Sequence, residues 1–239
     1  PDAAVQGIRE ILGVPAGAPF PAAQVEVVRL GTTVATNALL ERRGEPTLLV
    51  TTRGFADAIR IGHQARPDLF ALAVRRPEPL WAEALEVGER VGADGALVTP
   101  LDEAGLRSGL ARARAAGFRA CAIAFMHADR HPAHEVRAAE LARAAGFTQV
   151  TTSHEASRLM KLVPRAETAV VDAYLSPVLG AYVAGVAGAL RGAPLLCMQS
   201  NGGLVAAARF AGRDAVLSGP AGGVVAVVEA ARLAGFDAA

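Results

Sequence analysis

Short apolar runs alternate with amphipathic segments along the middle of the chain. An apolar run bounded by turn signals is typical of a buried strand, whereas apolar residues spaced three and four apart indicate a helix. On these criteria we expect strands at 25–30, 46–52, 120–126 and 149–152, and helices at 38–43, 102–117 and 132–145. Because strands that alternate with helices are joined as parallel neighbours by crossovers, we predict an α/β fold with layered parallel or mixed sheets.

Two further segments have signatures of their own. Alternation over 86–100, around Ala93-Asp94-Gly95, predicts a β-hairpin. The longest apolar stretch, 170–190, contains Asp172 and Pro177, and a carboxylate and a helix breaker make it a poor membrane span. We therefore expect a buried helix, kinked or broken at Pro177, in a protein that does not cross a membrane.

Near the end of the sequence, two glycine-rich turns follow expected buried strands. The run 195–199 leads into Ser200-Asn201-Gly202-Gly203, and the run 215–217 leads into 218–223, which opens an Ala- and Val-rich helix. Glycines let backbone N–H groups approach a ligand closely, and a helix N-terminus favours anions, so this layout suits a phosphate group. The alternative is that both segments are tight turns without a ligand.

An earlier turn, 31–37, places hydroxyl groups at the end of the strand 25–30. Thr32 or Thr33 would cap the following helix or would face a ligand at the edge of the sheet, and the sequence supports the two interpretations equally. Arg66, in a polar loop, could bind a carboxylate or a phosphate, although a solvent-facing or salt-bridged arginine is the commoner outcome.

Three histidines, His127, His131 and His134, gather near Asp129. A metal site is the less favoured interpretation, because His127 ends the strand 120–126 and a proline suits the first position of the next helix, so that the spacing is split across a turn. We expect these side chains to make capping and loop hydrogen bonds instead.

Composition narrows the class of protein. With 239 residues, 52% of them hydrophobic, the chain can bury a sizeable core as one large or two modest domains. A formal net charge of +1 and an aromatic content of 5% give no footprint for nucleic acid. Both cysteines, Cys121 and Cys197, lie inside apolar runs, which favours reduced, buried thiols and a cytoplasmic protein.

Six segments, in order and with matching spacing, resemble the hydantoinase A/5-oxoprolinase family. They are Gly31-Thr-Thr-Val-Ala-Thr-Asn-Ala-Leu-Leu-Glu-Arg-Arg-Gly44, Thr51-Thr-Arg-Gly-Phe55, Arg66-Pro-Asp-Leu69, Asp172-Ala-Tyr-Leu-Ser-Pro177, Met198-Gln-Ser-Asn-Gly-Gly203 and Ser218-Gly-Pro-Ala-Gly-Gly-Val224. The resemblance implies parts of the actin/sugar-kinase/Hsp70 ATPase fold, with residues 1–155 in an N-terminal-type domain and 156–239 in the start of a core domain. It also implies ATP-dependent hydrolysis of cyclic amides such as 5-oxoproline, through a phosphorylated carbonyl, with Mg²⁺.

The resemblance, together with the turns, suggests roles for particular residues. Thr32, Thr33 and Asn201 are expected to be catalytic, and Arg66 and Asp172 to bind the substrate. The expected nucleotide contacts are Gly202, Gly203, Ser218, Gly219, Gly222 and Gly223. The resemblance also implies an oligomeric assembly, which would include the rest of the subunit and a hydantoinase B-type partner.

Departures from the family pattern leave alternatives open. The family's Asp-x-Gly-Gly-Thr phosphate loops are missing from this sequence, which suggests an internal piece of a longer subunit, inactive alone. The family usually has arginine, asparagine and asparagine at the positions of His63, His131 and Asp172. These departures leave the identity of the substrate open. The alternatives are a subunit of an acetone- or acetophenone-type carboxylase, a non-catalytic nucleotide-binding or assembly module, and a plain α/β interaction domain.

Overall fold

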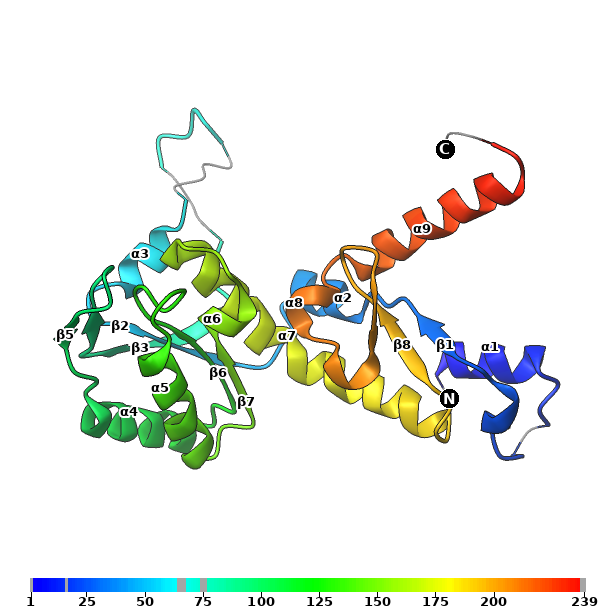
Figure 1. The fold of residues 1–239 in the computed structure, drawn as a ribbon, viewed down its shortest axis with the longest axis horizontal. Coiled ribbons are helices and arrows are strands. Elements are labelled where there is room, and N and C mark those ends of the chain that lie inside the picture. The colour runs from blue at the N-terminus through cyan, green and yellow to red at the C-terminus, as the bar shows by residue number, and fades with distance from the viewer. Residues whose placement is uncertain (1, 16, 64–67, 74–76, 237–239) are drawn as a thin grey trace. The chain divides into compact units, whose positions relative to one another are not determined.

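The chain packs as two compact units in the computed structural model, which describes residues 2–15, 17–63, 68–73 and 77–236 (Figure 1). Unit 1 comprises Pro1–Arg43 and Pro177–Ala239, and unit 2 is the continuous segment Gly44–Ser176. Unit 1 is therefore built from two separate segments, because the chain leaves it after Arg43 and returns to it at Pro177; the expected family domains 1–155 and 156–239 stay a prediction.

Unit 2 is built on a parallel sheet with the strand order β3-β2-β6-β7. The strands are β2 (Thr47–Thr52), β3 (Trp81–Val87), β6 (Ala120–Ala124) and β7 (Gln149–Thr152). Every residue of β2 and β6 is buried, as expected for central strands covered on both faces. The strands expected at 46–52, 120–126 and 149–152 are confirmed, whereas neither an apolar run nor alternation predicts β3.

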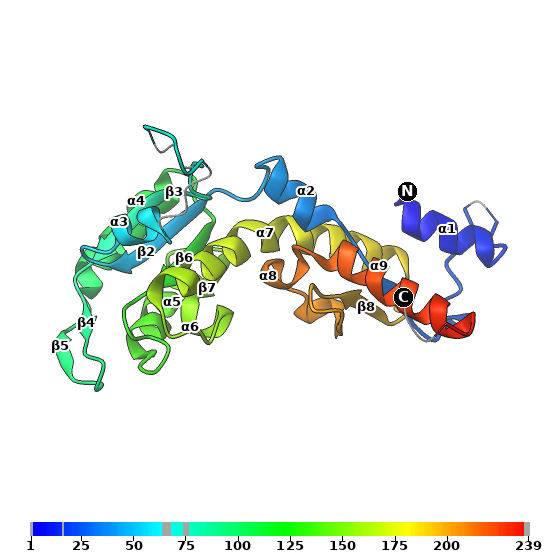
Figure 2. The ribbon, with the colours of Figure 1, turned by 90° about the horizontal axis from the view of Figure 1, so that it is seen from above.

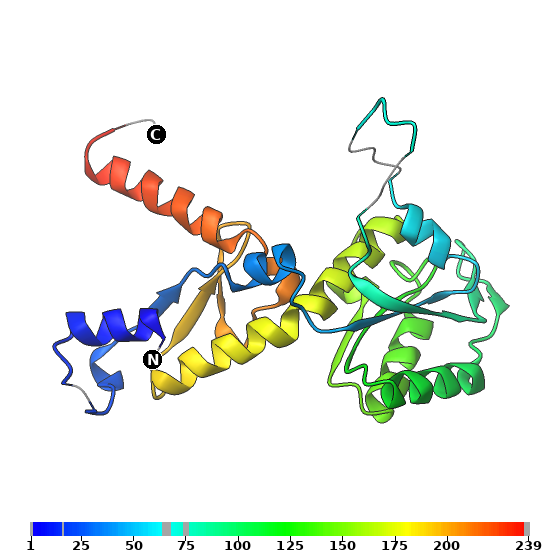
Figure 3. The ribbon, with the colours of Figure 1, turned by 180° about the vertical axis from the view of Figure 1, so that it is seen from behind.

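Helices cover both faces of this sheet. Side chains of Leu48 and Val50 pack with α4 (Glu103–Ala115) and α5 (Ala133–Ala144), while Leu49 packs with α3 (Ala56–Ile61) and the first part of α7 (Leu162–Ala189). Figures 1 and 3 show the resulting layers of helix, sheet and helix. The predicted α/β class with parallel and mixed sheets is therefore confirmed.

The expected hairpin at 86–100 is present as β4 (Arg90–Val91) and β5 (Leu97–Thr99), which are antiparallel. It extends beyond the main sheet in Figure 2. The helix expected at 102–117 begins with the predicted Asp102 cap, whose carboxylate accepts a hydrogen bond from the Gly105 N–H at 2.9 Å. A short helix, α6 (Ser153–Ala156), follows β7 directly.

Unit 1 contains a smaller mixed sheet with the order β1-β8-β9. Strands β1 (Val28–Leu30) and β8 (Leu195–Met198) are parallel, and β9 (Leu204–Ala206) is antiparallel to β8. The helices are α1 (Ala3–Ile11), α2 (Val34–Leu40), α8 (Gly212–Ala215) and α9 (Ser218–Leu233), with short 3-10 turns at Ala22–Gln24 and Ala207–Arg209. In Figures 1 and 3, α9 and the later part of α7 flank β1 and β8.

The strand expected at 215–217 is wrong. Ala215 ends α8, and α9 begins at Ser218, so the segment 218–223 forms the first turns of a helix and not a loop. Strand β8 already has a neighbouring strand on each side, β1 and β9, so the segment 215–217 could not pair with it. The expected strand 195–199 and its turn 200–203 are present, but the turn joins two antiparallel strands.

Helix α7 runs without a break through Pro177, so of the two expected outcomes the break is wrong and the kink stays a prediction. Among the described helices it is long and apolar enough to cross a membrane by length and composition. Half of its most apolar window is buried inside the protein, as in the core helix of many soluble proteins, and this helix alone is weak evidence for a membrane span. Ala166, Ala169, Ala173, Leu175 and Leu179 are completely buried along it.

Candidate functional site

The sheet of unit 1 brings two of the predicted segments to one edge. Strands β1 and β8 are parallel neighbours, with Val28 opposite Leu195 and Leu30 opposite Cys197. Their carboxyl ends therefore meet at the same edge, where ligands of open α/β sheets bind. The turn 31–33 leaves β1 at this edge and enters α2.

The first residue of α9 is attached to this turn by a buried hydrogen bond. The Ser218 hydroxyl donates to the Thr32 carbonyl oxygen at 2.7 Å, and both residues are buried. A second contact lies next to it, where the Thr36 hydroxyl donates to the Val216 carbonyl oxygen at 2.5 Å. Segments 180 and 186 residues apart in the sequence thus form one local structure.

Gly219 is required by this close approach. A Cβ atom at position 219 would lie 2.7 Å from Cγ2 of Thr33, closer than real Cβ contacts allow. At Gly222 the nearest neighbour of a Cβ atom would be Cγ of Met198 at 3.8 Å, which is an ordinary contact. Glycine at 219 is therefore a packing requirement, whereas glycine at 222 leaves backbone open on the side of the cavity described next.

A cavity of about 420 Å³ lies between the turn and the helix. Its walls include the turn residues Gly31, Thr32 and Thr33 and the helix residues Gly219 and Gly222. The first N–H groups of a helix lack intrahelical acceptors and carry the positive end of the helix dipole, which favours an anion. Since α9 is 16 residues long and Arg29 also lines the cavity, the site is suited to a phosphate group.

Two family models match the chain, and together they cover most of it. The hydantoinase/oxoprolinase N-terminal region matches residues 1–146, and the hydantoinase/oxoprolinase model matches residues 165–239. The chain belongs to the hydantoinase/oxoprolinase family. The resemblance seen in the sequence motifs is thereby confirmed.

Curated relatives of this hydantoinase/oxoprolinase chain include enzymes named 5-oxoprolinase. "5-Oxoprolinase 1" of Arabidopsis thaliana is 42% identical over 94% of this chain and 20% of its own length. "5-Oxoprolinase" of Saccharomyces cerevisiae is 38% identical, with the same two coverages. The chain therefore spans about a fifth of the length of these relatives.

Solved structures share the fold. The crystal structure of the ATP-dependent caprolactamase from Pseudomonas jessenii superposes with a TM-score of 0.83 at 31% identity, over 98% of this chain and 35% of that one. The nucleotide-free structure of acetone carboxylase superposes with a TM-score of 0.81 over the same shares, but at 20% identity its likeness shows the fold alone.

The predicted residues of the β8–β9 turn lie beside this cavity without lining it. Asn201 folds back on the turn, where its side-chain oxygen accepts from the Gly203 N–H at 2.8 Å. Gly202 has φ +82°, a conformation that favours glycine. Ser200 holds the chain before α9, because its hydroxyl donates to the Asp214 carbonyl oxygen and accepts from the Leu217 N–H. These turn residues therefore contact the segment that leads into α9 but do not line the cavity.

The remaining predicted site residues lie elsewhere in the hydantoinase/oxoprolinase chain. Gly223 is on an exposed part of α9, and a Cβ atom there would meet nothing within 4 Å. Asp172 is buried on α7 in unit 2, where its carboxylate accepts from the Thr151 hydroxyl at 2.9 Å and the Ser176 hydroxyl at 3.2 Å. Arg66 lies outside the described residues. The cavity therefore unites Thr32, Thr33, Gly219 and Gly222, with Ser218 joining its walls.

The three histidines make the loop contacts expected of them. Nδ1 of His127 lies 2.8 Å from the Val91 carbonyl oxygen, and Nε2 of His131 lies 3.4 Å from that of Ala93, so both hold the β4–β5 hairpin. His134 instead contacts the buried carboxylate of Glu89 at 2.7 Å. Across the described residues, the structure shows no cluster of side chains suited to a metal ion.

A buried polar network in unit 2 escapes prediction from the sequence. Glu135 is fully buried and accepts hydrogen bonds from the backbone N–H groups of Phe125 and His154, at 2.9 and 3.0 Å, and from the Ser153 hydroxyl. Nδ1 of His154 lies 2.6 Å from the Glu135 carboxylate, and Nη1 of Arg165, which is also fully buried, lies 3.4 Å from it. These groups lie where β6 and β7 end, at the carboxyl edge of the parallel sheet.

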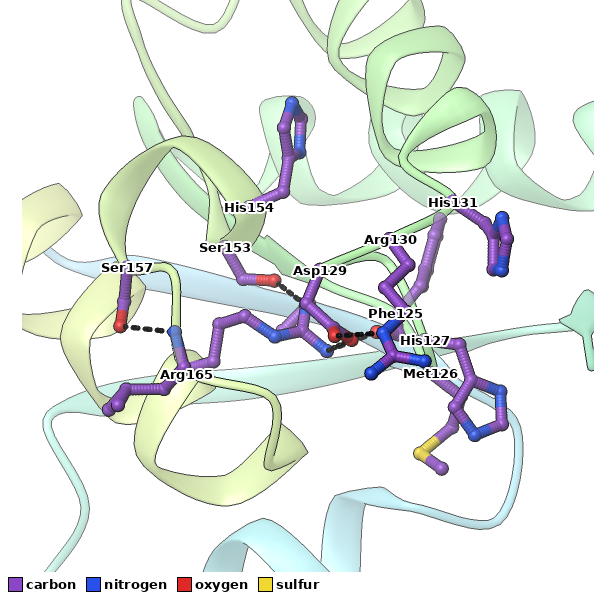
Figure 4. Close-up of polar contacts among 12 residues, drawn as sticks. Phe125, Met126, His127, Asp129, Arg130, His131, Ser153, His154, Ser157 and Arg165 are labelled. Atoms are coloured by element: carbon purple, nitrogen blue, oxygen red, sulfur yellow. Dashed lines mark hydrogen bonds and ion pairs between the residues drawn. The ribbon is translucent and has the colours of Figure 1, made fainter. Parts of the chain in front are cut away.

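Arg165 connects this network to Asp129. Its guanidinium donates to the Phe125 carbonyl oxygen at 2.9 Å and to the Ser153 hydroxyl, and lies 3.9 Å from the Asp129 carboxylate. Figure 4 shows it between Ser153 and Asp129. Burial lowers the pKa of Arg165, and the carboxylates of Glu135 and Asp129 oppose that shift. The sequence does contain one signal for this network, namely the polar residues that directly follow apolar strands, such as Ser153 after β7.

Proposed function

We propose that this chain is part of an ATP-dependent enzyme that opens cyclic amides, and that the cavity beside Thr33 and Gly219 holds a phosphate group of the nucleotide. The observation that carries this proposal is the hydrogen bond from Ser218 to the Thr32 carbonyl oxygen, which fixes a helix N-terminus against a hydroxyl-bearing turn at a sheet edge. Positioning and charge stabilisation are what phosphoryl transfer needs from a protein.

ATP suits this reaction for a chemical reason. A lactam carbonyl is stabilised by resonance, and transfer of a phosphoryl group to its oxygen makes the carbon an electrophile with a good leaving group. Water then adds to that carbon, the ring C–N bond breaks as a proton passes to the nitrogen, and hydrolysis of the resulting acyl phosphate releases inorganic phosphate and the open-chain amino acid. In this chain, the N–H groups of Ser218 and Gly219 at the start of α9 would bind phosphate oxygens, and the exposed Thr33 hydroxyl would donate to one of them.

Mg²⁺ fits the described walls of this cavity less well. The ion takes oxygen ligands, usually with one or two carboxylates, whereas the described residues that line the cavity offer threonine hydroxyls and no carboxylate. A nucleotide-bound Mg²⁺ therefore needs ligands from outside these residues. We accordingly expect the 239-residue chain alone to bind ATP poorly and to open no ring.

The relatives support a cyclic amide as the substrate class. They include 5-oxoprolinases, and "Caprolactamase subunit alpha" of Pseudomonas jessenii is 35% identical over 87% of this chain and 31% of its own length. The word "subunit" in that name supports a multi-subunit assembly, in which we propose a hydantoinase B-type partner. The buried free thiols of Cys121 and Cys197 support a cytoplasmic location.

The test uses the intact subunit together with its partner subunit. ADP release would be measured with 5-oxoproline, with caprolactam, and with acetone plus bicarbonate, while mass spectrometry identifies the products. The proposal expects ADP release coupled to a ring-opened amino acid from one of the lactams. A carboxylated product from acetone alone would establish the carboxylase alternative, and nucleotide binding without any turnover would establish the non-catalytic module.

A further inference from the structure

A second cavity lies at the carboxyl edge of the sheet of unit 2, beside the network of Figure 4. Its volume is about 310 Å³, near the lower end of the size of small-molecule sites. Residues that follow β6 and residues that open α7 form most of its wall, and Ala93 of the hairpin tip completes it. This is the edge of a parallel sheet at which ligands collect.

The wall of this cavity combines an apolar surface with charged groups. Met126, Met160 and Leu162 provide the apolar part, and Met160 is 67% exposed, so this surface is open to a ligand from solvent. Methionine side chains adapt their shape to small apolar ligands. A ligand that fills this space should therefore have an apolar body.

The charges around the cavity leave one positive charge in excess. Three cationic side chains line it, Arg130, Lys161 and Arg165, and the nearby carboxylates are Asp129 in its wall and Glu135 behind Arg165. Asp129 lies 3.9 Å from Arg165 and 4.0 Å from Arg130, so these carboxylates are engaged with the two arginines. Lys161 remains as the cation without an ion pair among the described residues.

Arg165 also has unused hydrogen-bonding capacity. Its side chain is fully buried in the wall of the cavity, and its Nε–H is the buried side-chain polar group without a hydrogen-bond partner among the described residues. Leaving such a donor unsatisfied is unfavourable, and an acceptor on a bound ligand would correct it.

We infer that this cavity is a binding site for a small organic monocarboxylate with an apolar stem. The carboxylate neutralises the excess charge and is held by Lys161 and Arg165, while the stem packs on the two methionines. Lys161 is the only lysine of the sequence, beside 23 arginines, and among the described residues that line the cavity its compact ammonium is the cation without an ion pair. This inference does not depend on the reaction proposed above.

The three methionines of the sequence provide the assay. Met126 and Met160 line this cavity, whereas Met198 lines the cavity of unit 1 and serves as an internal control. We would label the intact subunit with methyl-¹³C methionine, assign these three signals by single Met→Leu variants, and titrate hexanoate. Hexanamide, the neutral compound of the same shape, is the control ligand. With hexanoate we expect saturable shifts of the Met126 and Met160 signals and no shift of the Met198 signal. Hexanamide should bind at least tenfold more weakly than hexanoate.

One variant tests the role of the lysine without disturbing the fold. Lys161→Gln removes an exposed ammonium and should weaken hexanoate binding about two- to fivefold. Arg158→Gln is the matched control, since it removes a nearby exposed cation that does not line the cavity, and it should leave the affinity unchanged. Equal responses to hexanoate and hexanamide, or no shift at Met126 and Met160, would overturn the inference. Equal losses in the two variants would also overturn it.

The source of the carboxylate is decided by competition. If 5-oxoproline displaces hexanoate, the site binds the carboxylate of a substrate; if it does not, the site binds a separate carboxylate. The two results support the inference equally, because each starts from saturable hexanoate binding. A failed ring-opening assay would leave these methyl shifts unaffected, so failure of the proposed function and failure of this site are distinguishable.

Discussion

Replacing Gly222 by alanine should raise stability and weaken ATP binding at the same time. Gly222 lies in the second turn of α9 without a positive φ, and an added Cβ would meet only Met198 at 3.8 Å. Alanine is favoured over glycine in a helix by about 0.5–1 kcal/mol, so the unfolding free energy should rise by that amount. The methyl group, however, would project from the wall of the cavity.

The loss of affinity can be worked from the contact that is blocked. If a phosphate oxygen approaches the N–H groups of Ser218 and Gly219, the methyl group at position 222, which projects from the same cavity wall, would block one charge-assisted hydrogen bond, worth about 1.5–3 kcal/mol. ATP affinity should then fall roughly 10- to 150-fold. Gly223→Ala is the matched control, because position 223 is in the same helix, does not line the cavity and has open space around it.

The assay is isothermal titration of ATP and chemical denaturation of the intact subunit for both variants. We expect similar gains in unfolding free energy and a loss of affinity for Gly222→Ala alone. Wild-type ATP affinity in Gly222→Ala, with its gain in stability present, would show that the first turns of α9 do not contact the phosphate. The phosphate site would then have to be sought elsewhere.

Three further predictions concern single residues. Glu135→Gln should lower the unfolding free energy by roughly 3–5 kcal/mol, because the buried Arg165 then keeps only the more distant carboxylate of Asp129. Glu140→Gln, at an exposed ion pair, should cost less than about 1 kcal/mol, and denaturant titration measures both changes. Burial raises the pKa of Cys121 to about 12, so above pH 9 the folded state keeps a thiol proton that the unfolded state loses. The unfolding free energy should therefore fall between pH 9 and 12, and Cys121→Ala should reduce the slope of that fall by about 1.4 kcal/mol per pH unit. Thr33→Val should lower ATP-dependent turnover with little change in the thermal midpoint, because its hydroxyl makes no capping hydrogen bond. Thr32→Val should lower the unfolding free energy by about 1 kcal/mol, because its hydroxyl accepts from the N–H of residue 34. The reverse pattern would make Thr33 a structural residue.

Local patterns predicted the elements better than the contacts between them. The turn 200–203 and the Asp102 cap were readable because glycine, asparagine and aspartate act on their own backbone. The error at 215–217 arose because an apolar run does not say whether a strand has a free neighbour to pair with. Tertiary context decided that segment.

The site was recoverable only in part for a related reason. Motif order pointed to Thr32, Thr33 and Gly219, but not to the Ser218 contact that joins them, because that contact spans most of the chain. Glu135 and Arg165 lie in segments rich in charged residues, where a surface position is the default expectation. Only the packing of β6, β7 and α7 shows that these charges are buried.

The pairing of β1 with β8 also dictates an order of assembly. Val28 must find Leu195, whereas all of unit 2 lies on the uninterrupted segment Gly44–Ser176 between them. During synthesis, unit 2 can fold as soon as it has emerged, but β1 must wait unpaired until β8 is made. Prior folding of unit 2 would replace a long flexible loop by a compact one and so reduce the entropy lost when β1 and β8 meet. Strand β1 would thus lack its partner strand throughout the synthesis of unit 2, and over that period it would need protection on the ribosome.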